Sequence, residues 1–184
     1  MICYTHSPRP ICIPMNRECE QGFCSGAQKN APAEKQRSVY KMGKSYNEVK
    51  NDLSPDGALR DFYIKDIDPS DWDLFLIFVK ENIERYTFYW YDKEIPLPMS
   101  YKEIKRMQEE NPTILTIWIG EQTICCYFFI ESEIELDFKP NGIENAQKWN
   151  DLVSFFQSLV VTIGKKGIIT QENWEEYIID EIRP

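Results

Sequence analysis

From residue 59 onward, apolar residues recur with the period of a helix in some segments and of a strand in others. Residues 68–83 have the helical period, and Asp68 before them is the predicted N-cap. Residues 144–163 form a second amphipathic pattern, which Gly164 ends. A third helix is predicted in SYKEIKRMQEEN, which opens with the Ser-x-x-Glu pattern of a capping box.

The segments between these helices have the composition of strands. LRDFYIKDI, YTFYWY, KGIIT and EYIIDEI are each predicted as a strand, and QENWE as a helical turn between the last two. ILTIWIGEQTICCYFFI predicts a hairpin with Gly120 at the first central position of a type II′ turn. In that register Ile117 lies opposite Ile124, and Leu115 lies opposite Cys126. Because both faces of the second strand are apolar, we expect it to be central in the sheet and covered on both faces.

The chain divides into two parts of different character. All five tryptophans follow residue 58, whereas the first 58 residues combine five prolines with polar runs and show no periodicity. Such a segment buries too little apolar surface to offset its chain entropy, so we expect residues 1–58 to be a disordered tail. Residues 59–184 are expected to form one globular domain, in the order β-α-β-α-β-β-α-β-β. This order favours an α+β or α/β fold with one mixed sheet packed by about three helices.

The tail contains the groups that zinc prefers, but they are widely spaced. Structural zinc sites usually have cysteine pairs two to four residues apart, and only the last pair here comes near that spacing. A disulfide framework would call for a secretion signal, and none accompanies these cysteines. We therefore interpret the tail residues as unpaired thiols and one histidine, namely Cys3, His6, Cys12, Cys19 and Cys24.

The formal net charge of −9 is unevenly distributed. Residues 1–58 contain eight Lys or Arg and six Asp or Glu, whereas residues 59–184 contain thirteen and twenty-four. A domain this acidic is unsuited to nucleic acid, and it suits a basic partner or simply favours solubility. The sequence has no apolar run of membrane-span length and no apolar signal segment at its start, so we expect a soluble, cytoplasmic protein.

The stretch TICCYFFIESEIELDF ends with a carboxylate at every second position: Glu131, Glu133, Glu135 and Asp137. In a strand these groups share one face at a spacing of about 6.7 Å. Three interpretations are open, namely a solvated face, a docking surface for a basic partner, or a divalent-metal site. A single strand of this length is unusual, so we expect a bend or turn near Glu131 and Ser132. That break would separate Glu131 from the other three.

Other catalytic chemistry finds little support in the sequence. The single histidine is His6, so the domain lacks the histidine of catalytic triads and of His-ligated metal sites. Neither the phosphate-binding loop pattern nor the dinucleotide-binding pattern occurs. Cys125 and Cys126 are adjacent, so they face opposite sides of a strand and cannot jointly bind one ion; we interpret them as core thiols.

Four segments resemble, in order and spacing, a small group of uncharacterised bacterial single-domain α/β proteins. They are LRDFYIKDIDPSDWDLFLIFVKEN, IPLP, ILTIWIGEQTICCYFFIESEIELDF and GKKGIITQENW, and they cover most of residues 59–184. In style the chain also resembles bacterial immunity proteins, which are small and acidic and often neutralise a basic toxin domain. These resemblances imply a single domain and a basic protein partner, and they supply no catalytic residues.

The leading hypothesis is a non-enzymatic, intracellular bacterial interaction protein without a cofactor. It would bind a basic protein through a surface that includes Glu131, Glu133, Glu135 and Asp137. The alternative is a divalent-metal-dependent hydrolase or nuclease that uses carboxylates of the same row. A third hypothesis is a scaffold that forms homo-oligomers.

Overall fold

The computed structural model describes residues 43–184, and the three predicted helices are present there. The helices are α1 (Tyr46–Val49), α2 (Pro69–Asn82), α3 (Tyr101–Gln108) and α4 (Ala146–Ile163), with a short 3-10 helix η1 (Pro140–Gly142). Asp68 caps α2 as predicted, because its carboxylate accepts the backbone N–H groups of Ser70 and Asp71. Gly164 ends α4 in the left-handed conformation, with a φ of 74° that glycine adopts without a side-chain clash.

The strands of residues 43–184 form one sheet of eight strands in the order β3-β2-β4-β5-β6-β1-β7-β8. They are β1 (Arg60–Lys65), β2 (Tyr86–Trp90), β3 (Lys93–Ile95), β4 (Thr113–Ile119), β5 (Gln122–Cys126), β6 (Glu133–Phe138), β7 (Gly167–Gln171) and β8 (Trp174–Ile182). The α+β class is therefore confirmed, but every pair of neighbouring strands is antiparallel, so the prediction of a mixed sheet is wrong. The helical crossover α4 does connect two parallel strands, β6 and β7. However, β1 lies between them and is antiparallel to both.

The hairpin of β4 and β5 has the predicted register. Leu115 lies opposite Cys126 and Ile117 opposite Ile124, and Gly120 has a φ of 59°, as the first central position of a type II′ turn requires. The segment QENWE is not helical: its second and third residues form the turn between β7 and β8. Two strands are present that the predicted order did not contain. One is β3, and the other is β6, which is separate from the second strand of the hairpin.

The long apolar and acidic stretch is broken where the sequence predicted. Strand β5 ends at Cys126, and β6 begins at Glu133 after a turn at Glu131 and Ser132. The indole N–H of Trp72 donates to the Glu131 carbonyl oxygen at 2.8 Å, which ties this turn to α2.

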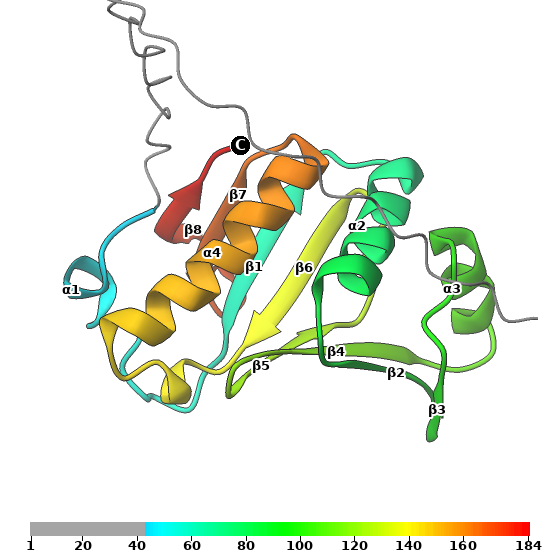
Figure 1. Ribbon diagram of the computed structural model, residues 1–184, viewed down its shortest axis with the longest axis horizontal. Coiled ribbons are helices and arrows are strands. Elements are labelled where there is room, and N and C mark those ends of the chain that lie inside the picture. The colour runs from blue at the N-terminus through cyan, green and yellow to red at the C-terminus, as the bar shows by residue number, and fades with distance from the viewer. Residues whose placement is uncertain (1–42) are drawn as a thin grey trace, which may run out of the picture. The chain divides into compact units, whose positions relative to one another are not determined.

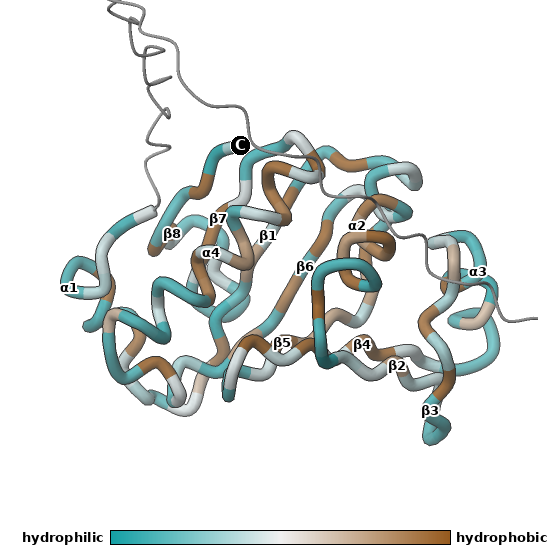
Figure 2. The backbone as a smooth tube through the Cα atoms, viewed as in Figure 1, coloured by the Kyte–Doolittle hydropathy of each residue, from teal (hydrophilic) through white to brown (hydrophobic). Residues whose placement is uncertain are grey.

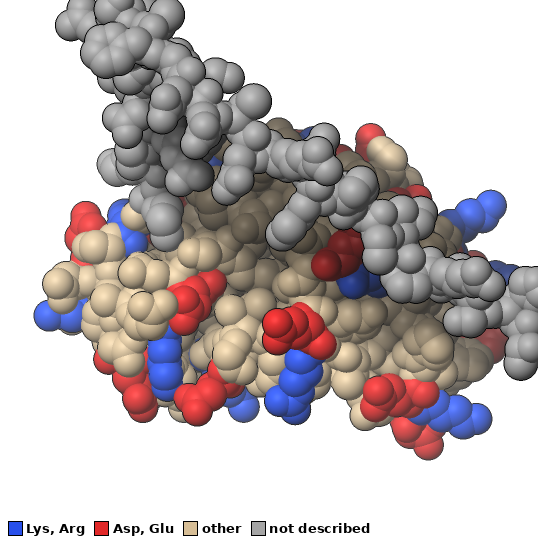
Figure 3. Space-filling view, in the orientation of Figure 1, with Lys and Arg blue, Asp and Glu red and all other residues tan. Residues whose placement is uncertain are grey.

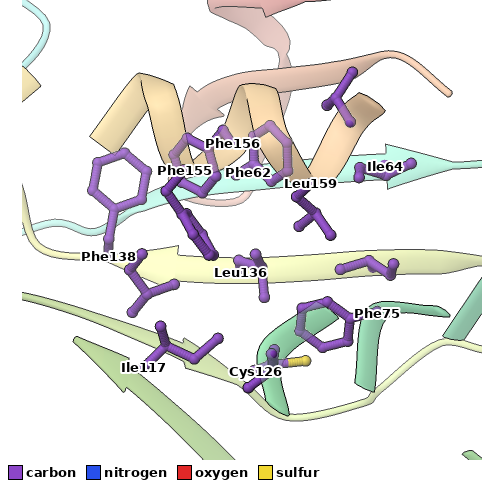
Figure 4. Close-up of a cluster of buried hydrophobic side chains, with 14 of the residues drawn as sticks. Phe62, Ile64, Phe75, Ile117, Cys126, Leu136, Phe138, Phe155, Phe156 and Leu159 are labelled. Atoms are coloured by element: carbon purple, nitrogen blue, oxygen red, sulfur yellow. The ribbon is translucent and has the colours of Figure 1, made fainter. Parts of the chain in front are cut away.

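The core lies between one face of the sheet and the helices. Helices α2 and α4 cross that face (Figure 1), and hydrophobic residues are concentrated along β4 to β6 and along these helices (Figure 2). The rings of Phe62 on β1 and Phe156 on α4 stack with their centroids 4.0 Å apart. Leu136 and Phe138 on β6 point into the same cluster (Figure 4).

No helix of residues 43–184 covers the opposite face of the sheet, which we call the open face. Strand side chains alternate between the two faces, so the odd-numbered residues of β1, β5 and β6 lie on the open face. Strand β5 is central as predicted, but it is covered by helices on one face only. On its open face it carries Thr123, which is exposed, and Cys125, which is half-buried.

Residues 43–58, which the sequence assigned to the tail, belong to the domain. Val49 and Leu53 are core residues, 0% and 3% exposed. The buried Arg60 guanidinium donates to the Asp52 carbonyl oxygen at 2.7 Å and forms an ion pair with Asp56. The predicted boundary at residue 58 therefore lies too far along the chain, because Val49 at the end of a four-residue helix and Leu53 in the turn after it give little periodic signal.

The remaining predictions for the tail concern Cys3, His6, Cys12, Cys19 and Cys24, which lie outside the described residues. Within residues 43–184, no helix combines the length and the apolar character that a membrane crossing needs.

Replacing Leu53 with alanine tests the new domain boundary. We expect Leu53→Ala to lower the free energy of unfolding by about 2–3 kcal/mol, because it removes a buried side chain from the core. Exposed Asn51 lies in the same segment, and Asn51→Ala should change stability by less than about 0.5 kcal/mol. Urea denaturation of the full chain measures both. Equal stability of the two variants would mean that this segment does not pack on the domain.

Candidate functional site

Three of the four predicted carboxylates lie together on the open face. Glu133, Glu135 and Asp137 are half-buried residues of β6. The residues between them, Ile134 and Leu136, are fully buried against the helices. The alternation that the sequence predicted therefore places the three acids on the side without helices.

Glu131 is separate from this row. It is exposed in the turn before β6, and its backbone oxygen accepts the Trp72 indole N–H on the side of the helices. Burial raises the pKa of the neighbouring Tyr101 hydroxyl to about 12, and the Glu131 charge contributes to that rise. Glu131 thus lies near α3 and not on the open face.

Strand β1 places a second row of polar side chains beside the carboxylates. In the β1–β6 register, Asp61 lies opposite Asp137, Tyr63 opposite Glu135 and Lys65 opposite Glu133. Sequence reasoning missed Asp61 and Tyr63 because nothing local shows that β1 pairs with β6. The only available signal was the alternation of polar and apolar residues in RDFYIK.

The Tyr63 hydroxyl connects two of the acids. Its oxygen lies 2.8 Å from Glu135 Oε1 and 3.1 Å from Asp61 Oδ2. A phenol has one hydrogen, so it can donate fully to only one carboxylate at a time. The carboxyl group that does not receive this hydrogen can still form a full hydrogen bond with Tyr63, provided that it is protonated and donates to the Tyr63 oxygen. The geometry therefore favours binding of an additional proton.

The turn between β7 and β8 folds over this part of the open face. The Asn173 N–H donates to Asp61 Oδ2 at 2.9 Å, and Glu172 accepts the backbone N–H of Leu59 at 2.8 Å. Glu175 forms an ion pair with Lys65. As a result Asp61 is only 3% exposed although no helix covers it. We use the term acidic cluster for Asp61, Glu133, Glu135, Asp137, Glu172 and Glu175.

Burial and mutual repulsion hold protons on the cluster. Burial raises the pKa of Asp137 to about 7, and the nearby charges of Asp61, Glu135 and Glu172 add to the rise. Burial likewise raises the pKa of Asp61, of Glu135 and of the Tyr63 hydroxyl. At neutral pH the cluster therefore carries less negative charge than the number of its carboxyl groups.

The acidic row does not assemble a metal site. Within residues 43–184, no group of three His, Cys, Asp or Glu side chains is placed to hold a metal ion. The hypothesis of a metal-dependent hydrolase therefore gains no support from these residues.

The two strand cysteines face opposite sides, as predicted. Cys126 is a core residue, whereas Cys125 is half-buried on the open face opposite Asp137, so only Cys126 fits the predicted core position. Burial raises the pKa of both thiols. A protonated thiol is a poor nucleophile, so neither side chain has the properties of a catalytic cysteine.

Comparison with known proteins adds no assignment: no family model, curated protein or solved structure matches this chain.

The raised pKa of Asp137 predicts a pH-dependent effect of its replacement. Between about pH 4 and pH 7 Asp137 is protonated in the folded protein and ionised in the unfolded chain. Unfolding then releases a proton, so this group lowers stability progressively as pH rises through that window. We expect the stability of Asp137→Asn relative to the wild type to increase by about 1–2 kcal/mol from pH 5 to pH 8.

Urea denaturation at the two pH values measures this difference. The exposed residue Asp92, in the turn after β2, provides the matched control Asp92→Asn, which removes one carboxylate at an exposed position. An effect of Asp137→Asn that is the same at pH 5 and pH 8 would show that Asp137 is ionised normally in the folded protein.

Proposed function

We propose that this chain is a non-enzymatic interaction protein that binds a basic protein partner on the open face of its sheet. The observation that carries the proposal is the acidic cluster, in which β1, β6 and the β7–β8 turn each place carboxyl groups on a face without helices. Within residues 43–184, no ion pair joins Asp61 or Asp137 to a lysine or arginine. A cationic side chain of a partner would supply that missing counter-charge.

The charges on the other side of the domain are arranged differently. Figure 3 views the side of the helices, where acidic and basic side chains are interspersed around uncharged surface. A mixed surface of this kind steers a charged partner weakly, whereas a cluster of one sign attracts the opposite charge at longer range. The open face is therefore the better docking surface for a basic protein.

Aromatic side chains beside the cluster provide apolar contact area. Tyr127 stacks on Phe129 with the ring centroids 5.1 Å apart, and Phe129 is 64% exposed. Such residues contribute much of the affinity at protein interfaces, while charges mainly raise the association rate and select the partner.

The proposed setting is the cytoplasm of a bacterium, with an immunity-like role in which the chain neutralises the basic domain that it binds. The acidic composition supports a basic partner, and the protonated thiols together with a single histidine at position 6 support a role without catalysis. Formation of homo-oligomers is the competing proposal.

Neutralising two of the cluster carboxylates tests this function. The full chain with Glu133→Gln and Glu135→Gln should capture less of the basic partner from a lysate of the source organism. With the captured protein purified, its association rate should fall about 2- to 10-fold at low salt, and the salt dependence should weaken. Glutamine retains the oxygen that accepts the Tyr63 hydrogen bond.

The matched control is Glu109→Gln with Glu110→Gln, which changes the net charge equally at exposed positions after α3. If both double variants slow association equally, net charge matters and the acidic cluster does not. If the chain captures only further copies of itself, the homo-oligomer replaces this proposal.

A further inference from the structure

A cavity of about 470 Å³ lies on the open face beside the acidic cluster. Tyr63, Ile168 and Ile178 provide its apolar lining. Tyr63 also belongs to the hydrogen-bonded network of the cluster, so the two features adjoin at this residue. The cavity falls within the roughly 300–1,000 Å³ that is typical of ligand pockets.

The apolar lining is accessible from solvent. Ile178 on β8 is 48% exposed, and Ile168 on β7 is half-buried and lies opposite Tyr63 in the β1–β7 register. Covering these isoleucines would remove apolar surface from water, which is the main source of affinity in most protein interfaces. The cavity thus offers what the acidic cluster lacks, a place for an apolar side chain.

The charges around the cavity select the kind of segment that fits. Three lysines line it, but each is already paired: Lys65 with Glu133 and Glu175, Lys165 with Asp71 at 2.6 Å, and Lys166 with Glu181 at 3.3 Å. Asp66 is the one carboxylate in the lining of this cavity. The lysines are therefore neutralised within the fold, and the uncompensated charge that adjoins the cavity is that of the acidic cluster, which meets it at Tyr63 and favours a cation.

We propose that this cavity is the anchor site of the basic partner. An apolar side chain of the size of leucine or phenylalanine inserts between Tyr63, Ile168 and Ile178. A lysine or arginine of the same segment then lies over the acidic cluster. This inference rests on the proposed function and adds to it the chemistry of the segment that the partner presents.

Two synthetic peptides of equal charge test the anchor site. One has two lysines on each side of a central phenylalanine, and the other has serine at the centre. Titrated into the isotope-labelled full chain, the phenylalanine peptide should shift the backbone amide signals of Tyr63, Ile168 and Ile178. It should also bind about five- to tenfold tighter than the serine peptide, because only phenylalanine buries apolar surface.

The variant Ile178→Ser should reduce this preference to less than about twofold, because it removes an exposed wall of the cavity. Leu74→Ser is the matched control, since Leu74 on α2 is also exposed, at 41%, and this variant should keep the full preference. Ile178 makes little contact with the core, so the variant is expected to fold. An unchanged amide spectrum away from β8 checks that expectation.

The outcomes separate this inference from the proposed function. Equal binding of the two peptides, no shift at the three amides at millimolar peptide, or a preference that survives Ile178→Ser overturns the anchor site. These results leave the acidic surface standing if Glu133→Gln with Glu135→Gln still weakens both peptides. Shifts of the same amides with protein concentration alone would assign the cavity to a second copy of the chain and also overturn the anchor site.

Discussion

The alternation of side chains along β6 determines which face of the sheet the helices cover and which face remains open. Ile134, Leu136 and Phe138 must face the helices, because they pack in the same core as Phe62 and Phe156. The carboxylates between them then have only the opposite side available. A shift of one residue in the pairing with β1 would bury three acids and expose three apolar residues, so this register is strongly specified.

The turn between β7 and β8 then converts a row of solvated acids into a cluster. By itself, β6 would present carboxylates that repel one another only weakly in water. The folded turn removes water from Asp61 and brings Glu172 close, so the same groups repel more strongly. The backbone N–H of Asn173 and the Tyr63 hydroxyl offset part of this repulsion. The remaining part appears as the raised pKa values of Asp61, Glu135 and Asp137.

Local patterns predicted the elements whose determinants are local. Gly120 fixed the hairpin register, Asp68 and Gly164 marked helix ends, and the length of the apolar stretch required the turn before β6. Pairings between distant segments were not predictable in this way. Nothing near β1 indicates that it lies between β6 and β7, so the antiparallel sheet and the contribution of Asp61 were missed. The same limit applies to Leu53, which is apolar in a polar segment and gains its partners only in the fold.

The distribution of counter-charge within the cluster indicates where the proposed partner would place a cation. The fold provides Lys65, but this side chain pairs with Glu133 and Glu175 at the edge of the cluster. Burial raises the pKa of both carboxyl groups of the inner pair, Asp61 and Asp137, and at Asp137, where the pKa is about 7, a proton takes the place of a cation. A basic side chain placed over this pair would favour the ionised forms and release the proton from Asp137. In the proposed complex, the outer carboxylates Glu133 and Glu175 would attract a basic partner at a distance. The inner carboxyl groups, Asp61 and Asp137, would interact strongly only with a cation in direct contact. An apolar anchor beside Tyr63 would hold that cation in place.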